Sequence, residues 1–418
     1  MHTPPTDIEA LTLLAQPEGR LDPYPLYDRL RIYPPPYDER HKAVLVLNYD
    51  DCVRALSAKG FTRPDHTWLK RRIPDWAEHP SVVAGTLMMQ FGDKLSHPRR
   101  RGMVNRFFSK RRIDTLVEVE SASVDRLLTE LTEQVRQTGQ ADLQQAVSFR
   151  LPAIAIANIL GIPVSDVAGF RPAILAFGKL LEPALSPQDL AEVDESFQAL
   201  GDYFDHVIAQ RRSEPDDHLI SYLVHVHDTD PDALSAEELT AMLISVFGAG
   251  TINTSGFIGN GVAALLNEPD MFAYLRTHPS ATDAAITEIL RYDTPMQITR
   301  RMTTKGLELG GCVLPEGTEL AVALGAANRD PQVFTDPGRF KLNRPEPQPL
   351  SFGGGSYFCI GAAMARQEGS LVFRKLIQQL PTLRLAGTAR HNQRSVLRGY
   401  LELPVTTLDS PTPARSQL

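Results

Sequence analysis

Apolar residues recur at helical spacing through most of the chain between residues 98 and 268. Glycine and proline interrupt this pattern, so we expect several long helices, with breaks at 161–163, 186–187, 213–215 and 230–231. Shorter helical patterns lie outside this region, at 22–30, 50–56, 280–292 and from residue 362 onward. Most of the chain is therefore expected to be α-helical.

Strand patterns are few and short. Apolar residues form a β-type run at 43–47 and alternate with polar residues between the Gly and Pro turns of 306–324. Residues 63–92 mix proline, tryptophan and methionine without a clear period, so we expect an irregular segment there. The sequence thus predicts a mainly α fold with a small β portion.

The longest helical pattern begins after Ser235 and continues to about Leu266. Ser235 can cap this helix while Glu238 reaches back to it, as in a capping box. About 30 residues with a rise of about 1.5 Å each span about 45 Å, enough to cross a domain. Glycines at 248 and 250 each cost about 1 kcal/mol relative to alanine. They indicate either close helix packing, a local kink or the close approach of a flat group.

Composition is that of a soluble globular protein, with 418 residues, 42% of them hydrophobic and 22% charged. We find no linker or internal repeat, so we expect a single domain over 1–418, with a disordered tail at 409–418. Three cysteines are too few for a disulfide framework and favour a reducing cytoplasm. The N-terminus has no signal-peptide pattern, and we expect no membrane anchor. A net charge of −7 argues against a nucleic-acid binder.

One cysteine, Cys359, lies in a glycine-rich loop at 352–361, directly before a predicted helix. Free amide groups and the helix dipole favour a thiolate at such a position. The glycines allow the backbone to fold tightly over a flat group and to direct amides at the sulfur. Cys359 is therefore a candidate ligand of a haem iron. The alternative is a buried structural cysteine.

The loop Phe-Gly-Gly-Gly-Ser-Tyr-Phe-Cys-Ile-Gly resembles the haem-binding signature of the cytochrome P-450 family, which ligates haem through a cysteine thiolate. Tyr357 departs from that signature, because a basic residue that contacts a haem propionate usually stands there. Further family features follow in the expected order, including 22–25, 215–217 and the long helix. The resemblance implies a soluble, bacterial-type P-450 with a triangular fold and haem b held between the long helix and the cysteine loop.

The resemblance also implies roles for particular residues. Cys359 is the expected iron ligand, and further cofactor contacts are expected from His97, Arg101, Arg301, Phe352, Tyr357 and Gly361. Glu288 and Arg291, three apart on one helix, match a family motif that forms a buried network with a later arginine, here Arg344. We expect this network to be structural and to hold the cysteine loop in place. Substrate-pocket candidates are Met88, Met89, Val246, Met296 and Gln297.

The long helix departs from the family pattern at the position that carries its proton chemistry. Relatives read Ala-Gly-x-Asp/Glu-Thr, whereas this chain has Ala249, Gly250, Ile252 and Asn253. Isoleucine carries no proton, and asparagine forms hydrogen bonds without titrating. We therefore assign Asn253, with Ala249 and Gly250, to the catalytic segment.

Three functions remain open. The usual chemistry of the family favours hydroxylation of a small molecule in bacterial secondary metabolism. The altered helix fits oxidative coupling, ring closure or desaturation of a cyclic dipeptide or another natural product. A non-catalytic helper protein is the third, although such helpers tend to lose the cysteine that this chain keeps.

A basic cluster lies at the start of the helical region, and we define it as Arg99, Arg100, Arg101, Arg106, Lys110, Arg111 and Arg112. Such a cluster can be a solvated helix face, can anchor haem carboxylates, or can dock an acidic electron donor. The resemblance implies a ferredoxin or a similar electron-transfer partner, and relatives of this type are mostly monomers.

Overall fold

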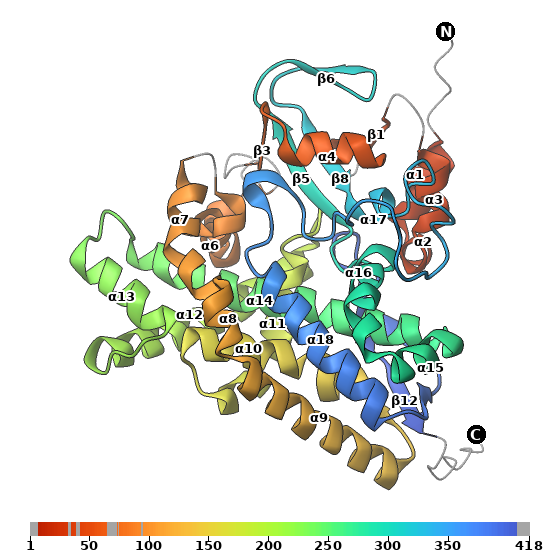
Figure 1. Cartoon of the computed structure of the whole chain (residues 1–418). Helices are drawn as coiled ribbons and strands as arrows, with labels where there is room; N and C mark the ends of the chain where they lie inside the picture. Colours follow the sequence, from red (N-terminus) through yellow and green to blue (C-terminus); the bar gives the residue numbers. More distant parts are fainter. Residues whose placement is uncertain are drawn as a thin grey trace.

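The computed structural model describes residues 7–31, 35–38, 42–64, 73, 75–92 and 95–407, so the predicted tail at 409–418 lies outside the described residues. Helices form most of this structure (Figure 1). Their bounds are α1 Ile8–Ala15, α2 Pro17–Leu21, α3 Tyr24–Leu30, α4 Tyr49–Ser57, α6 Pro80–Leu87, α7 Ser96–Asn105, α8 Lys110–Asp114, α9 Val117–Thr138, α10 Arg150–Leu160, α11 Arg171–Lys179, α12 Pro187–Ser213, α13 Leu219–Thr229, α14 Ala236–Leu266, α15 Pro269–Thr277, α16 Thr282–Tyr292, α17 Leu324–Ala327 and α18 Ala362–Gln379.

The strands are short. Their bounds are β1 Tyr37–Asp38, β2 Ala43–Val46, β3 Phe61–Thr62, β4 Ala141–Asp142, β5 Ile298–Thr303, β6 Leu307–Leu309, β7 Cys312–Leu314, β8 Glu319–Ala323, β9 Leu383–Leu385, β10 Arg390–His391, β11 Tyr400–Glu402 and β12 Pro404–Thr407. The largest sheet has the order β1-β2-β8-β5-β3, in which β2 and β8 are parallel and the other pairs antiparallel. The predicted mainly α fold with a small β portion is confirmed.

Helix α14 crosses the helical region and packs against α6, α10, α11, α12, α16 and α18 (Figure 1). This confirms the longest predicted helix. The Ser235 hydroxyl accepts from the Glu238 backbone N–H at 3.2 Å, as expected of a cap. The reciprocal half of the capping box is wrong, because the Glu238 carboxylate accepts hydrogen bonds from Arg99 and Arg100 instead.

Strand β2 is buried on both faces because helices cover both sides of the sheet. Val44 and Val46 face α4, while Ala43 and Leu45 face α1 and α3. This explains why residues 43–47 read as a continuous apolar run without alternation. In Figure 1 this sheet and α1–α4 lie above the helices around α14.

Two expectations about local structure need correction. The segment 63–92, expected to be irregular, contains α6 and two single 3₁₀ turns, Trp76–Glu78 and Met89–Phe91. Pro80 at the first position starts α6. Strand β5, which lies before the predicted strand region, was missed because its sequence, Ile-Thr-Arg-Arg-Met-Thr, places two arginines in a central strand.

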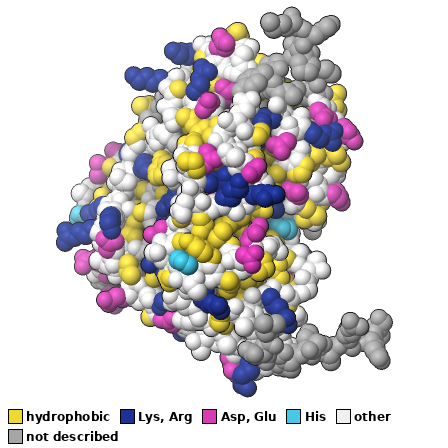
Figure 2. Space-filling model, turned by 45° about the vertical axis from the view of Figure 1, so that its right-hand side comes forward, with side chains coloured by type: hydrophobic (Ala, Val, Ile, Leu, Met, Phe, Trp, Pro, Cys, Tyr) yellow, Lys and Arg dark blue, Asp and Glu magenta, His cyan; other side chains and the backbone are white. Residues whose placement is uncertain are grey.

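One helix among the described residues, α14, is long and apolar enough to cross a membrane by length and composition. It is a core helix here, since 72% of its most apolar stretch is buried inside the protein. On the face shown in Figure 2, basic and acidic side chains are interspersed around apolar areas, and they do not form one extended basic field.

Candidate active site

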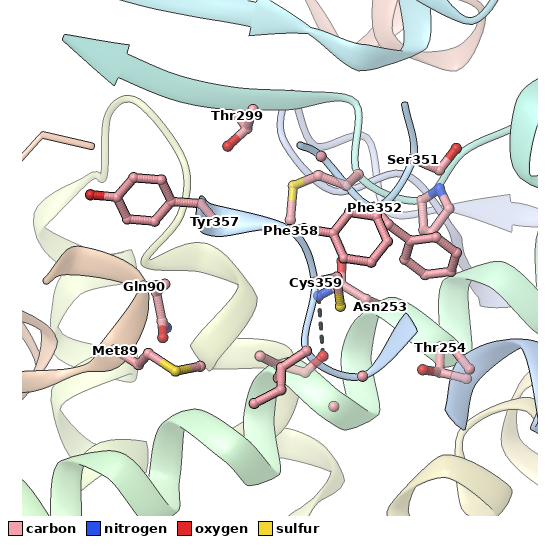
Figure 3. A pocket seen from close by; sticks show the side chains of 18 of the residues that line it. Met89, Gln90, Asn253, Thr254, Thr299, Ser351, Phe352, Tyr357, Phe358 and Cys359 are labelled. Atoms are coloured by element: carbon pink, nitrogen blue, oxygen red, sulfur yellow. Dashed lines mark hydrogen bonds between the residues drawn. The ribbon is translucent and has the colours of Figure 1, made fainter. Parts of the chain in front are cut away.

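A cavity of about 260 Å³ lies between α14 and the loop that carries Cys359 (Figure 3). In that view Met89 and Gln90 lie at one end of the cavity and Thr254 lies at the other. Most predicted site residues border it: Met89, His97, Arg101, Val246, Ala249, Gly250, Asn253, Met296, Arg301, Phe352, Tyr357, Cys359 and Gly361. Folding therefore brings together residues that are up to about 270 positions apart in sequence.

The cysteine loop owes its shape to two glycines in the left-handed region. Gly353 has φ +71° and Gly355 has φ +63°, and a Cβ on Gly355 would lie 2.5 Å from the Leu56 carbonyl oxygen on α4. The Cys359 N–H donates to the Phe352 carbonyl at 2.9 Å, and α18 begins three residues after the cysteine. The loop thus delivers Cys359 to the N-terminus of a helix, as the sequence predicts.

The Cys359 sulfur has accessible surface because it faces the cavity, although protein atoms surround it. Burial raises the pKa of the Cys359 thiol, while a hydrogen bond from the Gly361 N–H and the charges of Arg101 and Arg63 lower it. Burial outweighs the stabilisation that we expected from the helix terminus. At such a site the sulfur becomes a thiolate when a cation binds it directly.

Cationic side chains gather at the side of the cavity near Tyr357. Arg301 is 2% exposed, and its guanidinium lies 5.1 Å from the centre of the Tyr357 ring. Arg63 lies 5.6 Å from the same ring and donates to the Gln90 carbonyl at 2.7 Å. Burial and Arg63 lower the pKa of Arg301 to about 9. These two arginines repel each other, and no described ion pair joins either of them to a carboxylate.

His97 and Tyr357 lie between these cations. The His97 ring lies 4.3 Å from the Tyr357 ring, and burial together with Arg101 lowers the pKa of His97 to about 4. The Tyr357 hydroxyl lies 3.2 Å from Thr62 Oγ1, so its hydrogen bond is made within the protein. Arg101 donates to the Phe358 carbonyl at 2.8 Å and so fixes α7 to the cysteine loop.

This group of cations fits an anionic cofactor. Arg63, Arg101 and Arg301 border one cavity, and the only carboxylate among the described lining residues is Glu368. Buried guanidinium groups need anionic partners, and two carboxylates on one flat molecule would supply them. Haem b carries two propionates, and the sulfur borders the same cavity, so the residues fit the cofactor. Arg63 was missed in the sequence because no motif marks it within 63–92.

Two predicted pocket residues lie outside the cavity. Met88 directly follows α6 and packs into the core around α14, and its sulfur accepts from the Gln90 side chain at 3.4 Å. Gln297 donates to the Thr294 carbonyl at 2.7 Å and to the Tyr24 hydroxyl at 3.4 Å. The adjacent residues, Met89 and Met296, border the cavity in place of Met88 and Gln297.

The glycines of α14 serve close helix packing. A Cβ on Gly248 would lie 2.7 Å from the Phe177 ring of α11, and one on Gly250 would lie 2.5 Å from Ile156 of α10. The packing explanation is therefore sufficient for Gly248. Gly250 also borders the cavity, so it additionally leaves room there.

Asn253 stands at the junction of two hollows. Its Nδ2 donates to the Ala249 carbonyl at 3.1 Å, while its buried Oδ1 has no protein donor. Asn253 borders the main cavity and also a second hollow of about 30 Å³, which Ser255, Gln144 and Asn392 line. A space of this size with polar walls has room for one or two water molecules. Ile252 borders the second hollow and is not among the residues that line the main cavity.

The Glu288 network connects α16 to the cysteine loop. Arg291 donates to Glu288 at 2.7 and 2.8 Å, and Arg344 donates to the same carboxylate at 3.0 Å. Arg291 also donates to the Asn328 carbonyl at 3.0 Å, and the Asn328 side chain accepts from the Leu350 N–H at 2.7 Å. Leu350 is two residues before the loop. The contacts are those of a structural anchor.

The basic cluster divides into separate groups. Arg99 and Arg100 bind Glu238, and Arg100 also donates to the Met88 carbonyl at 3.0 Å, so these two stabilise the fold. Arg106 stacks on the Tyr222 ring at 3.5 Å. Lys110 pairs with Asp114 at 2.9 Å, and Arg111 is exposed. Lys110 and Arg111, at the end of the cluster, form a solvated face.

The fold and the cavity are those of a haem-binding oxidoreductase, and comparison with known proteins identifies the family. The family model "Cytochrome P450" matches residues 37–388. The chain belongs to the cytochrome P450 family, an enzyme family whose members bind haem b and to which the monooxygenases among its relatives belong.

Relatives are bacterial. The chain is 32% identical to a putative cytochrome P450 140 of Mycobacterium tuberculosis over 99% of this chain and 94% of that protein. It is 32% identical to the cytochrome P450 monooxygenase PikC of Streptomyces venezuelae over 92% of this chain and 91% of that protein.

Solved structures agree with this assignment. CYP164A2 of Mycobacterium smegmatis superposes with a TM-score of 0.85 at 29% identity, covering 96% of this chain and 100% of that one. CxnD, a P450 for C–S bond formation in chuangxinmycin biosynthesis, superposes with a TM-score of 0.77 at 29% identity and 89% coverage of both chains.

Proposed function

We propose that this P450 inserts one oxygen atom of dioxygen into a small, largely apolar organic molecule of bacterial secondary metabolism. The observation that supports this most is the position of the Cys359 sulfur at a mostly apolar cavity, beside arginines that no carboxylate pairs with among the described residues. In this proposal Cys359 binds the haem iron as a thiolate, and the haem supplies the oxidising chemistry when bound.

The propionates are assigned to the cationic side of the cavity. His97, Arg101 and Arg301 hold them in this proposal, as the sequence predicts, and Arg63 joins them on the evidence of its position. Neutral His97 donates one hydrogen bond, while the arginines supply the positive charge. Phe352 and Gly361 shape the part of the cavity beside the sulfur.

The substrate is assigned to the apolar wall of the cavity. Met89, Val246 and Met296 border it, together with Ile156, Phe177 and Leu181. Gln90, Ser245 and Thr299 add the few polar groups that orient a ligand in such a pocket. Asn253, beside Ala249 and Gly250, orders water between the two hollows, so that protons reach the cavity without an acid at position 252.

Oxidative bond formation without oxygen insertion is the second candidate. Two observations favour it: Ile252 and Asn253 replace the acid and the alcohol, and the similar protein CxnD is described as forming a C–S bond. The relative PikC, by contrast, is described as a monooxygenase. The apolar cavity and the presence of Cys359 beside it argue against a helper protein without catalysis.

Isotope labelling separates the two reactions. A library of small natural products is first screened for ligands that shift the haem absorption, and the hits are turned over under ¹⁸O₂ with a surrogate ferredoxin. We expect products that are heavier by one ¹⁸O atom. Products that lack ¹⁸O and have lost two hydrogens would establish oxidative coupling or desaturation instead.

The setting of the enzyme is proposed on the same basis. We infer that it works in the cytoplasm as a monomer and receives electrons from a ferredoxin or a similar protein. The membrane-length helix lies in the core, and Arg101 of the basic cluster donates to the Phe358 carbonyl of the cysteine loop.

A further inference from the structure

Arg394 is a mostly buried arginine in the loop between β10 and β11. Its backbone N–H donates to Asn392 Oδ1 at 3.3 Å. Among the described residues, none accepts a hydrogen bond from its guanidinium and none forms an ion pair with it. Burial lowers the pKa of Arg394, but an arginine still carries its charge at neutral pH. A buried charge of this kind calls for an anionic partner.

The acidic residues around Arg394 are engaged with other groups. Glu182, Glu192 and Asp189 act on its guanidinium through their charge. Glu182 accepts from two backbone N–H groups of the Arg394 loop, at 2.9 and 3.0 Å. Asp189 and Glu192 both bind Lys179, at 2.7 and 2.6 Å. The carboxylates of the described structure therefore leave Arg394 without a direct partner.

The Arg394 side chain passes beside position 252 of α14. Gly178 of α11 makes room for it, because a Cβ at Gly178 would overlap Arg394 Nη1 and would lie 2.5 Å from Ile252 Cδ1. The guanidinium and the end of the Ile252 side chain thus lie next to each other over the same glycine. Relatives carry an acid at position 252, whereas Ile252 has no charge. This chain has a cation beside that position without a carboxylate to compensate it.

Arg394 borders the second hollow, of about 30 Å³, and a smaller one of about 10 Å³. Arg171 and Arg398 also border the second hollow, and the described residues that line it include no carboxylate. Arg398 binds Asp293 at 2.6 Å, and Arg171 donates to the Leu401 carbonyl at 3.0 Å. Three arginines around one small space produce a positive potential that favours an anion.

The size and the polar walls of the second hollow restrict the anion. A space for one or two water molecules accommodates a chloride ion but not a sulfate or a phosphate. Asn392 and Tyr400 border the hollow as neutral donors, and burial raises the pKa of Tyr400 to about 12, so its hydroxyl keeps its proton. Asn253 Oδ1 and Gln144 Oε1 have no protein donor. A water that donates to one of them can donate its second hydrogen to the anion.

We propose that the second hollow binds one monovalent anion of chloride size at the guanidinium of Arg394. The anion supplies, beside position 252, the negative charge that relatives carry on an acid. It also connects α11, α14 and the loop between β10 and β11, which all contribute to this space. The arginines assigned to the propionates line the main cavity instead, so the anion site is separate from the cofactor site and does not depend on the reaction proposed above.

Thermal melting of the haem-loaded protein tests anion binding without substrate or turnover. As chloride replaces gluconate at constant ionic strength, the melting temperature of the wild type should rise by about 2 °C or more and then level off, because the anion binds the folded protein. Arg394→Gln should lose this rise. Without chloride it should melt at or above the wild-type temperature, since it removes an unpaired buried charge. Arg136→Gln, at an exposed arginine of α9, is the matched control and should respond as the wild type does. A wild type indifferent to chloride, or the same rise in Arg394→Gln, would overturn the proposal.

Two further experiments locate the anion. Ile252→Glu places a carboxylate beside Arg394, so this variant should melt above the wild type in gluconate and should no longer respond to chloride. An unchanged chloride response would contradict the proposed position. In wild-type crystals grown with sodium bromide, anomalous scattering should show one bromide next to the Arg394 guanidinium. A water at that place, or bromide on the protein surface only, would reject the site.

Discussion

At the scale of single residues, the arginines beside the cavity have opposite effects on the stability of the haem-free protein and on its affinity for the cofactor. Arg301 carries a positive charge beside Arg63 in a buried site. The folded-state pKa of about 9 lies below the ordinary value. Arg301 stays charged at neutral pH, and burying this charge lowers the free energy of unfolding of the haem-free protein. A dianionic cofactor reverses this penalty.

Replacing Arg301 with Gln should therefore have opposite effects on the two forms of the protein. Haem affinity should fall by about 10- to 100-fold, as expected when a charge-assisted hydrogen bond worth about 1.5–3 kcal/mol is lost. The haem-free variant should melt at a higher temperature than the haem-free wild type. Transfer of haem to apomyoglobin and thermal melts measure the two effects, and Arg111→Gln is the exposed control. Unchanged haem transfer would remove Arg301 from the propionate site.

The residues at 252 and 253 allow a test of proton supply. The double variant Ile252→Glu/Asn253→Thr restores the acid and alcohol of the family pattern. If the native chain relies on water ordered by Asn253, this variant should change the share of electrons recovered in product by about twofold or more. Product and peroxide are measured per NADH consumed, with Ile252→Gln/Asn253→Thr as the control that adds polarity without an acid. Identical coupling in all three proteins would mean that these positions do not govern proton delivery.

At the scale of elements, the Glu288 network holds α16 to the cysteine loop. Arg291 and Glu288 are 2% and 3% exposed, so removing one partner leaves a charge buried without compensation. Glu133 and Arg136 on α9 have the same spacing, but their side chains are 46% and 72% exposed. The chain thus contains a buried pair and an exposed pair of the same kind.

Arg291→Leu should lower the free energy of unfolding by about 3–5 kcal/mol, because breaking a buried ion pair leaves Glu288 and Arg344 without their shared partner. Arg136→Leu should lower it by less than about 1 kcal/mol. Urea unfolding of the haem-free proteins, followed by circular dichroism, gives both values. Similar losses in the two variants would contradict the structural role assigned to the buried network.

Sequence predicted the elements that rest on local signals and missed those that rest on contacts between distant segments. The Ser235 cap and the helical spacing of apolar residues predicted α14, and the glycine-rich loop identified Cys359 as a candidate ligand. Strand β5 was missed because its arginines read as polar, although Arg301 faces the cavity. Arg63 could not be found, since its neighbours Gln90 and Thr299 come from other elements. Met88 and Gln297 do not border the cavity, because family position does not fix the direction of a side chain.

At the scale of the whole molecule, the basic cluster is connected to the cysteine loop through Arg101, and α8, which carries Lys110 and Arg111, packs against α18, the helix that follows the loop. Arg101 binds the Phe358 carbonyl, and the Phe358 ring is 45% exposed. Lys110 and Arg111 follow on α8. In a chain with a net charge of −7, these cations place positive charge near the cysteine loop. An acidic electron donor would be guided to the side nearest the cysteine.

Reduction by an acidic ferredoxin should therefore slow as salt increases. Exposed charges are screened over about 8 Å at physiological ionic strength, so the association rate should fall several-fold between low and physiological salt. The double variant Lys110→Gln/Arg111→Gln should be slower at low salt and less sensitive to salt, while Arg136→Gln, on distant α9, should behave as wild type. Stopped-flow reduction measures these rates. Rates that do not depend on salt would exclude the cluster as a docking surface.

Every functional proposal made for this chain assumes that the Cys359 sulfur binds the haem iron. The carbon-monoxide difference spectrum of the reduced, haem-loaded protein reports on that bond directly. We predict the red-shifted Soret band of a thiolate-ligated haem in the wild type, and its loss in Cys359→His with haem still bound. A wild-type spectrum without that band, or the same band in Cys359→His, would contradict the account.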